Sequence, residues 1–216
     1  MAAIDMRGRF ITLEGGEGAG KTTLIQALAE KLRGRGLDVI VTREPGGTPG
    51  AEVLREILLT GSTDRWSPMT EALLMYAARV DHVERLIAPA LQRGAWVLSD
   101  RFADSTTAYQ GAAGGVPIER IKALHQAALG NFKPDLTLIL DVNPTTGIER
   151  TIARGEDATR FERFDPGFHG RLRRAFLDIA DDEPDRCIVI DGNEAADIVF
   201  SHAVSAIDEH LGARLL

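Results

Sequence analysis

The feature that most constrains this chain is a glycine-rich loop close to its N-terminus, at residues 15–22. The loop reads Gly-Gly-Glu-Gly-Ala-Gly-Lys-Thr, which matches the pattern G-x-x-x-x-G-K-[ST]. Glycines let backbone N–H groups converge on phosphate oxygens, and the N-terminus of a following helix adds the positive end of its dipole. The pattern predicts that Lys21 reaches the β- and γ-phosphates of a nucleotide and that the Thr22 hydroxyl binds Mg²⁺. The alternative is an ordinary glycine-rich turn that contains a stray lysine.

The segments around the loop predict an α/β fold. Apolar runs typical of strands alternate with segments of helical periodicity, and parallel strands need a crossover of this kind. We expect a three-layer P-loop NTPase fold, in which a parallel five-stranded sheet has helices on both faces. The predicted strands are 10–13, 39–41, 96–98, 136–140 and 188–190. The predicted helices are 21–32, 51–59, 68–92, 117–129, 144–153, 172–179 and 195–211, with Pro89 expected to end or kink the third.

The chain shows no internal repeat and no linker, so residues 1–216 are expected to form a single domain. Residues 154–170 are charged, contain glycine and are poor in aliphatic side chains. We interpret this segment as a flexible lid and assign it no secondary structure.

Composition excludes several classes of function. The formal net charge is -7, so the chain lacks the basic surface typical of nucleic-acid-binding proteins. No apolar run reaches the roughly 18 residues of a membrane span, and the N-terminus lacks the apolar core of a secretory signal. Cys187 is the only cysteine, which precludes an intrachain disulfide. We therefore expect a cytoplasmic protein with neither nucleic-acid nor membrane partners.

A second element on the magnesium side is predicted at Asp100. This residue follows the hydrophobic run 96–98 and so lies at the carboxyl end of a predicted strand, where ligands gather in open α/β sheets. Strands often end in aspartate, but together with the phosphate loop this position predicts a metal site formed by Thr22 and Asp100.

The phosphate loop alone does not separate kinases, GTPases, motors and nucleotide switches. The chain has no Asn-Lys-x-Asp motif of the kind by which common GTPases read their base, and it lacks the several domains of a motor. A small kinase or a nucleotide-binding protein remains.

Five sequence segments, taken in order along the chain, narrow the choice between these protein classes. They are Phe-Ile-Thr-Leu-Glu-Gly at 10–15, Thr-Arg-Glu-Pro-Gly-Gly-Thr at 42–48, Tyr-Ala-Ala-Arg at 76–79, Asp-Arg-Phe-Ala-Asp-Ser at 100–105 and Pro-Asp-Leu-Thr-Leu-Ile-Leu-Asp-Val at 134–142. In these segments the chain resembles the bacterial-type thymidylate kinases, along nearly its whole length. The resemblance implies a Mg²⁺-dependent enzyme that uses ATP and dTMP, and also a homodimer.

The resemblance assigns roles to individual residues. Planar arginines hold phosphate groups bidentately, and Arg101 is expected to hold the acceptor phosphate, with Arg43 nearby and Arg79 on the base or phosphate side. Glu17 is expected to accept a hydrogen bond from the deoxyribose 3′-hydroxyl. A solvated surface charge is the alternative for each arginine, and an exposed loop acid is the alternative for Glu17.

The remaining substrate contacts also come from the resemblance. Thr106 and Tyr109 are expected to meet the base edge and the sugar, where a tyrosine ring leaves no space for a ribose 2′-hydroxyl; an ordinary half-buried helix residue is the alternative for Tyr109. Met75 stands where the family often has a phenylalanine that stacks on thymine, which makes the stacking looser. The predicted acceptor-binding set is Glu17, Arg43, Glu44, Pro45, Met75, Arg79, Arg101, Ser105, Thr106 and Tyr109, and the predicted ATP-binding set is Gly15, Gly16, Glu17, Gly18, Ala19, Gly20, Lys21, Thr22 and Thr23.

Phosphoryl transfer needs cations around the transferred group. The phosphate loop supplies only Lys21, because Gly18 stands where some relatives have an arginine. The predicted lid is rich in arginine, and Arg154 and Arg160 are its expected donors, which makes Lys21, Arg101, Arg154 and Arg160 the predicted catalytic set. A deoxynucleoside kinase and a nucleotide-sensing protein without turnover are the alternative functions.

Overall fold

A computed structural model describes residues 8–153, 159–213 and 215. Its centre is a parallel sheet of five strands in the order β2-β3-β1-β4-β5. Two registers place the ends of the strands: Leu13 on β1 pairs with Asp100 on β3, and Arg43 on β2 also pairs with Asp100. The carboxyl ends of β1, β2 and β3 therefore meet at one edge of the sheet. The strands are β1 (Phe10–Glu14), β2 (Val39–Arg43), β3 (Trp96–Asp100), β4 (Leu136–Asp141) and β5 (Cys187–Asp191).

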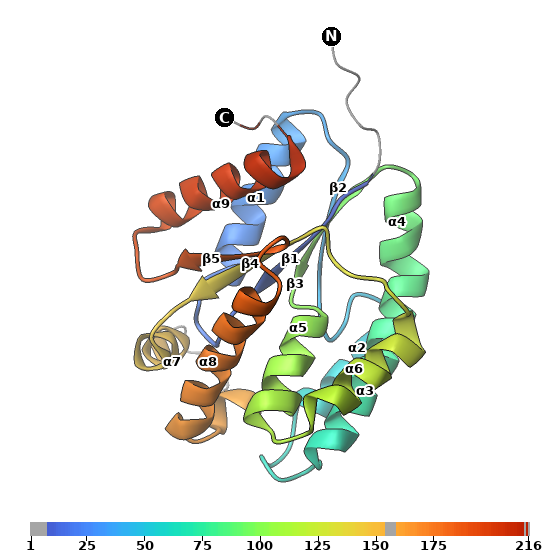
Figure 1. Cartoon of the computed structure of the whole chain (residues 1–216), viewed down its shortest axis with the longest axis vertical. Coiled ribbons are helices and arrows are strands. Elements are labelled where there is room, and N and C mark those ends of the chain that lie inside the picture. Colours follow the sequence, from blue (N-terminus) through green and yellow to red (C-terminus); the bar gives the residue numbers. More distant parts are fainter. Residues whose placement is uncertain (1–7, 154–158, 214, 216) are drawn as a thin grey trace.

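Helices cover both faces of this sheet, as the predicted three-layer fold requires. Figure 1 shows α1 and α9 on one side of the sheet and α5 and α8 on the other. The helices are α1 (Lys21–Gly34), α2 (Pro49–Leu59), α3 (Pro68–His82), α4 (Ala88–Gln92), α5 (Ala103–Thr106), α6 (Ile118–Leu129), α7 (Pro144–Ala153), α8 (Pro166–Asp182) and α9 (Ala196–Leu211). Short π-helical and 3-10 segments are η1 (Val83–Ile87), η2 (Thr107–Ala113) and η3 (Phe161–Arg163).

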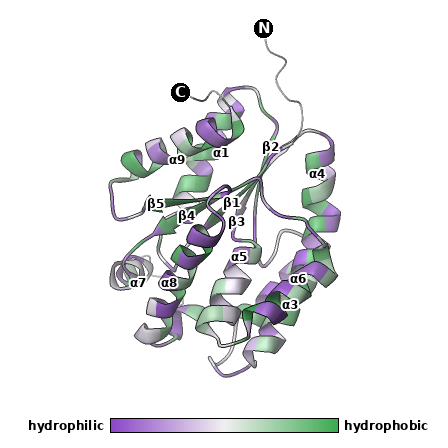
Figure 2. Ribbon diagram, in the orientation of Figure 1, coloured by the Kyte–Doolittle hydropathy of each residue, from purple (hydrophilic) through white to green (hydrophobic). Residues whose placement is uncertain are grey.

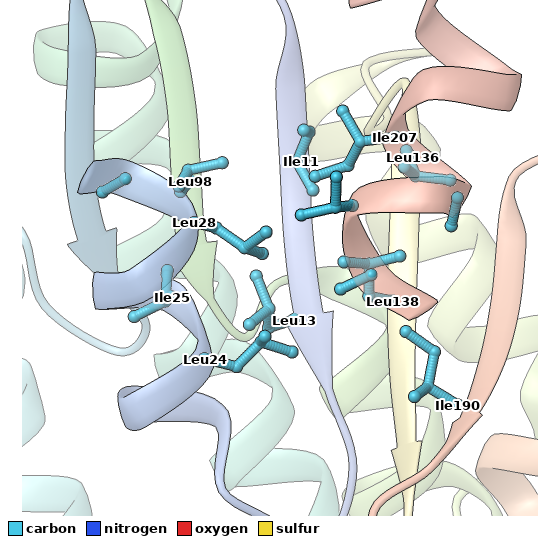
Figure 3. Packing of buried hydrophobic residues seen from close by; sticks show 14 of the residues in the cluster. Ile11, Leu13, Leu24, Ile25, Leu28, Leu98, Leu136, Leu138, Ile190 and Ile207 are labelled. Atoms are coloured by element: carbon cyan, nitrogen blue, oxygen red, sulfur yellow. The ribbon is translucent and has the colours of Figure 1, made fainter. Parts of the chain in front are cut away.

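The largest hydrophobic core lies between the sheet and the α1–α9 layer. Leu13 on β1 and Leu138 on β4 face Leu28 of α1 and Ile207 of α9, and all four side chains are fully buried or nearly so (Figure 3). Strands buried on both faces must be apolar along their length, and Figure 2 shows the central strands in the green of hydrophobic residues. This packing fixes the phosphate loop, because the loop joins β1 directly to α1.

The predicted helix 68–92 is observed over the same residues, as the consecutive segments α3, η1 and α4. It continues through Pro89 as α4, but a π-helical turn, η1, precedes the proline. Proline lacks an N–H group and clashes with the preceding turn of a regular α-helix, and the wider π turn accommodates both effects. Pro89 therefore reshapes the helix without ending it.

The predicted lid is partly regular structure. Its last residues, from Pro166 onward, form the first turn of α8, and Asp165 caps that helix by accepting a hydrogen bond from the Phe168 backbone N–H. An aspartate followed by a proline is a signal for a helix start, so the sequence contained this information. Residues 154–158 of the predicted lid lie outside the described residues.

In the part of the chain that the structure describes, no helix is long and apolar enough to cross a membrane.

Candidate active site

One cavity of about 320 Å³ opens at the carboxyl ends of β1, β2 and β3. The phosphate loop forms part of its wall, and side chains from α3, α5 and η2 form another part. Most of the predicted site residues line it, including Lys21, Thr22, Asp100, Arg101 and Tyr109. The other predicted residues on its wall are Glu17, Gly18, Ala19, Gly20, Thr23, Glu44, Pro45, Met75, Arg79, Ser105 and Thr106, and Arg55, Leu59, Phe102, Gln110, Thr159, Phe161 and Glu162 complete it.

The phosphate loop holds its lysine in place through its own carbonyl groups. The Lys21 Nζ atom donates to the carbonyl oxygens of Gly15 at 3.2 Å and Gly16 at 2.9 Å. Burial lowers the pKa of Lys21, and the positive charge of Arg101 lowers it further. Two cations thus stand at the loop, where an anionic phosphate would relieve their repulsion.

Thr22 and Asp100 meet as the sequence predicts. The Thr22 hydroxyl donates to the Asp100 carboxylate at 3.1 Å, which brings the first turn of α1 to the end of β3. Hydroxyl and carboxylate oxygens are the ligands that a hard divalent cation prefers. The described residues contain no cluster of three or more His, Cys, Asp or Glu that could hold a metal alone. The pair therefore suits a cation that takes most of its ligands from nucleotide phosphates and water.

Arg101 organises the centre of the cavity. Its Nη1 atom donates to the Gly15 carbonyl at 2.9 Å and its Nη2 atom to the Glu17 carboxylate at 3.2 Å. The guanidinium also lies over the Tyr109 ring, 4.9 Å from its centroid. Burial by itself lowers the pKa of Arg101, but Tyr109, Glu17 and Asp100 outweigh it and the net pKa is raised. Arg101 is therefore a fixed positive charge beside the phosphate loop.

The backbone at Arg101 is in the left-handed region, with φ of 74°. Residues other than glycine pay a steric cost for this conformation, and it persists only where the surroundings enforce it. Here the buried Glu14 carboxylate accepts the backbone N–H of Phe102 at 2.7 Å and the Ser105 hydroxyl at 2.6 Å. Glu14 thus holds the chain on the far side of the strained residue and keeps the guanidinium in the cavity.

Arg79 also lines the cavity, and its side chain is buried. Its Nε atom donates to Glu44 at 2.7 Å, and its Nη2 atom donates to the Phe102 carbonyl and to the Thr106 hydroxyl. His82 contacts the second Glu44 oxygen at 2.9 Å, so the carboxylate is held from two sides. Arg79 and Gln110 each keep one buried atom, Nη1 and Oε1, without a hydrogen-bond partner among the described residues.

Similarity to known proteins identifies the family of the chain. The family model "Thymidylate kinase" matches residues 13–202. A thymidylate kinase of Caulobacter vibrioides is 56% identical over 206 residues, which cover 95% of this chain and 99% of the relative. One of Afipia carboxidovorans is 51% identical over 97% of this chain and 92% of the relative. The chain belongs to the thymidylate kinase family.

A solved structure supports the fold of this family member. The crystal structure of thymidylate kinase from Ehrlichia chaffeensis is 32% identical in sequence and superposes with a TM-score of 0.75. The match covers 93% of this chain and 99% of that one. The parallel sheet with helices on both faces is therefore confirmed as the thymidylate kinase fold.

Two of the predicted arginines lie away from the cavity. Arg43 is more than half exposed, pairs with Glu52 at 3.2 Å and is not part of the cavity wall. Arg160 is fully buried against α2 and α3, where it forms an ion pair with Glu71 at 2.6 Å. Their predicted contacts with phosphate stay predictions. Arg154 lies outside the described residues.

Sequence reasoning missed four polar residues of the cavity wall, of which Thr159 and Glu162 lie in the predicted lid and Arg55 and Gln110 lie on helical segments. Arg55 on α2 lines the cavity and donates to the Pro45 carbonyl at 2.7 Å. Gln110 on η2 also lines it. Neither lies in one of the five segments that carried the resemblance, and an arginine or glutamine within a helix has no motif of its own.

Proposed function

We propose that this chain transfers the γ-phosphoryl group of ATP to dTMP, giving dTDP and ADP on the route to dTTP, with Mg²⁺ as cofactor. The observation that carries the proposal is one cavity that is lined both by the phosphate loop and by Arg79 and Gln110. A donor nucleotide would bind at the phosphate loop, and an acceptor base would bind at Arg79 and Gln110. Membership of the thymidylate kinase family supports the same reaction.

At the phosphate end, the chain's own residues supply positive charge and position. Lys21 would bind the β- and γ-phosphates, and Arg101 would hold the acceptor phosphate beside them. Phosphoryl transfer has little covalent chemistry for a protein to perform, so positioning and electrostatic stabilisation account for the catalysis. We propose direct in-line transfer to the acceptor phosphate, without a covalent enzyme intermediate.

Thr22 and Asp100 are the residues that would hold Mg²⁺. When bound, the ion neutralises charge that develops on the transferred group. Asp100 also shares its strand end with Arg43 and Leu13, which fixes its position relative to the phosphate loop.

At the base end, the unpaired atoms match thymine. Thymine offers an acceptor at O4 next to a donor at N3–H, which complements the Arg79 Nη1 donor and the Gln110 Oε1 acceptor, two buried atoms without a hydrogen-bond partner among the described residues. Cytosine offers an amino donor at position 4 and an acceptor at N3, so both contacts would fail. Unpaired buried polar groups are costly, which makes such a site selective. Met75 lies on the same wall and would contact the face of the ring.

The sugar would lie between Tyr109 and Glu17. The Tyr109 ring would exclude a 2′-hydroxyl, and the Glu17 carboxylate would accept the 3′-hydroxyl. Arg101 and Lys21 lower the pKa of Glu17 against the opposing effect of burial, so the carboxylate stays ionised and able to accept.

The experiment is coupled ADP release with Mg²⁺-ATP and a panel of dTMP, dUMP, dCMP, dAMP, dGMP, UMP and thymidine. We expect strong turnover with dTMP, with dUMP as a weaker substrate. A Lys21→Ala variant should lose turnover by orders of magnitude while it remains folded. Turnover with thymidine instead would indicate a nucleoside kinase, and ATP binding without any turnover would indicate a sensing protein.

A homodimer is part of the same proposal. Val53 on α2 and Leu73 on α3 are 59% and 50% exposed, and the two helices pack against each other. These apolar side chains would be covered in a dimer that is built on α2 and α3. Sedimentation at several concentrations tests this, and a monomer at all concentrations would refute it.

A further inference from the structure

A chain of polar contacts leads from Gln110 away from the cavity into the protein. The Gln110 side-chain amide donates through Nε2 to the Glu71 carboxylate at 3.0 Å. The other Glu71 oxygen lies 2.6 Å from Nη2 of Arg160. Neither Glu71 nor Arg160 lines the cavity, and both are buried. The three side chains come from η2, α3 and the residue before η3, so the fold brings them together from distant parts of the sequence.

Arg160, the last residue in this series of polar contacts, is held rigidly. Its backbone N–H donates to the Leu59 carbonyl, its Nε atom to the Leu58 carbonyl at 3.1 Å and its Nη1 atom to the Thr63 carbonyl at 3.0 Å. The guanidinium also lies 4.7 Å from the centroid of the Phe161 ring. Nη2 makes no aligned hydrogen bond and contacts Glu71 as an ion pair. A planar guanidinium with these contacts places a fixed positive charge against Glu71.

The direction of the Gln110 amide follows from this arrangement. A carboxylate accepts hydrogen bonds and donates none, so only the NH₂ group of Gln110 can face Glu71. The amide oxygen is left on the other side of the amide group, where no described residue donates a hydrogen bond to it. Without Glu71 the amide could rotate by half a turn and present a donor in place of an acceptor.

We propose that Glu71, held by Arg160, is a positioning residue that fixes the Gln110 amide and thereby makes the site selective for a pyrimidine with an N3–H donor. The inference rests on the proposed function, because it explains how the same cavity separates thymine and uracil from cytosine. It also gives Arg160 a role that differs from the predicted phosphate contact. Glu71 and Arg160 act through Gln110 and touch no substrate.

The test is Glu71→Gln, which keeps the shape of the side chain and lets residue 71 donate. We expect KM for dTMP and dUMP to rise about tenfold to a hundredfold, because a buried acceptor is replaced by a rotatable amide. The ratio of kcat/KM for dTMP over dCMP should fall at least about tenfold. KM for ATP should stay near its wild-type value, because the phosphate loop is untouched.

Two further variants keep the test decisive. Glu71→Gln leaves the Arg160 charge buried without its partner, which is destabilising. If that protein does not fold, the double variant Glu71→Gln/Arg160→Met removes both charges, and it should show the same loss of base selectivity. Val204→Ala in the α9 core is the matched control for lost stability, and its base selectivity should remain that of the wild type.

The outcomes separate this inference from the proposed function. Wild-type protein that shows no preference for dTMP over dCMP would overturn the proposed function itself. A selective wild type together with a folded Glu71 variant of unchanged selectivity and KM would overturn only the role of Glu71. A loss of kcat with equal effects on dTMP and dCMP would also contradict it, since a general structural role acts in that way.

Discussion

The Tyr109 hydroxyl donates a hydrogen bond to the Glu17 carboxylate across a distance of 2.6 Å. The contact links η2 to the phosphate loop, two segments that are far apart in the sequence. Arg101 donates to the same Glu17 oxygen and lies over the Tyr109 ring. Glu17, which is proposed to bind the sugar, and Tyr109, which is proposed to exclude ribose, are therefore positioned by their own hydrogen bond and by their shared contact with Arg101.

Replacing Tyr109 by phenylalanine separates these two effects. The variant loses the hydrogen bond to Glu17 but keeps the ring, so kcat/KM for dTMP should fall up to about tenfold while the preference for deoxyribose persists. Tyr109→Ala removes the ring as well and should admit the ribonucleotide. Kinetics with dTMP and its ribose counterpart measure both effects. A phenylalanine variant that accepts ribose as readily as deoxyribose would refute the assignment.

Glu14 predicts a dependence of stability on pH. Burial, with the neighbouring Asp104 charge, raises the pKa of Glu14 from 4.5 to about 7. Between these values the folded protein holds a proton that the unfolded chain has released, so the stabilisation is complete below pH 4.5 and is lost as the pH rises towards 7. The loss is on the order of 3 kcal/mol.

Urea unfolding of wild type and Glu14→Gln between pH 5 and pH 8 checks this prediction. The free energy of unfolding of the wild type should fall relative to that of the variant as the pH rises. The variant cannot titrate at this position and so serves as the reference. Parallel curves across the range would show that Glu14 does not release its proton there.

The fold could be predicted because its signals are local. Residues 136–140 form an apolar run, and the observed strand β4 is buried along nearly its whole length. The conformation of the phosphate loop likewise follows from the glycines in its own sequence. In contrast, η2 has neither the 3.6-residue period of an α-helix nor a cap, and α5 before it is four residues long. η2 packs against α8 and α3, and α5 packs against η2, and no local pattern contains these contacts.

Residues of the cavity wall could be predicted where they lie in a sequence motif that has a known chemical role, as Lys21, Asp100 and Arg101 do. It was less predictable where several residues of one type compete. Arg43 follows a strand in a recognisable segment, but its side chain turns to Glu52, and Arg55 from α2 lines the cavity. Arg160 was predicted from the need for cations, but its contacts with Leu58, Thr63 and Glu71 bury it. Only the three-dimensional packing decides between such candidates.

Arg55 and Arg43 can be tested by the same substitution. Because Arg55 lines the cavity, we propose that it contacts the acceptor phosphate; such a hydrogen bond is charge-assisted, so Arg55→Gln should raise KM for dTMP about tenfold or more. Arg43→Gln should change it less than about threefold, because that side chain is exposed and already paired with Glu52. Initial rates at saturating ATP measure both. A larger effect at Arg43 would support the contact with the acceptor phosphate that its sequence segment predicts.

The phosphate loop packs against α7 through two glycines. A Cβ atom on Gly18 would overlap the Gly147 carbonyl oxygen, and a Cβ on Gly147 would overlap the Glu17 carbonyl oxygen. Gly18 also has a positive φ of 65°, which disfavours any side chain. An arginine cannot take the place of Gly18 unless α7 moves, so cations for the transferred group must come from elsewhere in the chain.

Gly147→Ala tests how tightly this contact holds the loop. Both groups that would collide are backbone, and backbone yields less easily than the end of a side chain, so the loop should shift away from its phosphate-binding position. We expect KM for ATP to rise and kcat to fall, each by about tenfold. Gly170→Ala on α8 is the matched control, because its new Cβ would meet nothing within 4 Å. The control should keep wild-type kinetics and equal or exceed wild-type stability by a few tenths of a kcal/mol. If Gly147→Ala binds and turns over ATP like the control, α7 does not fix the loop.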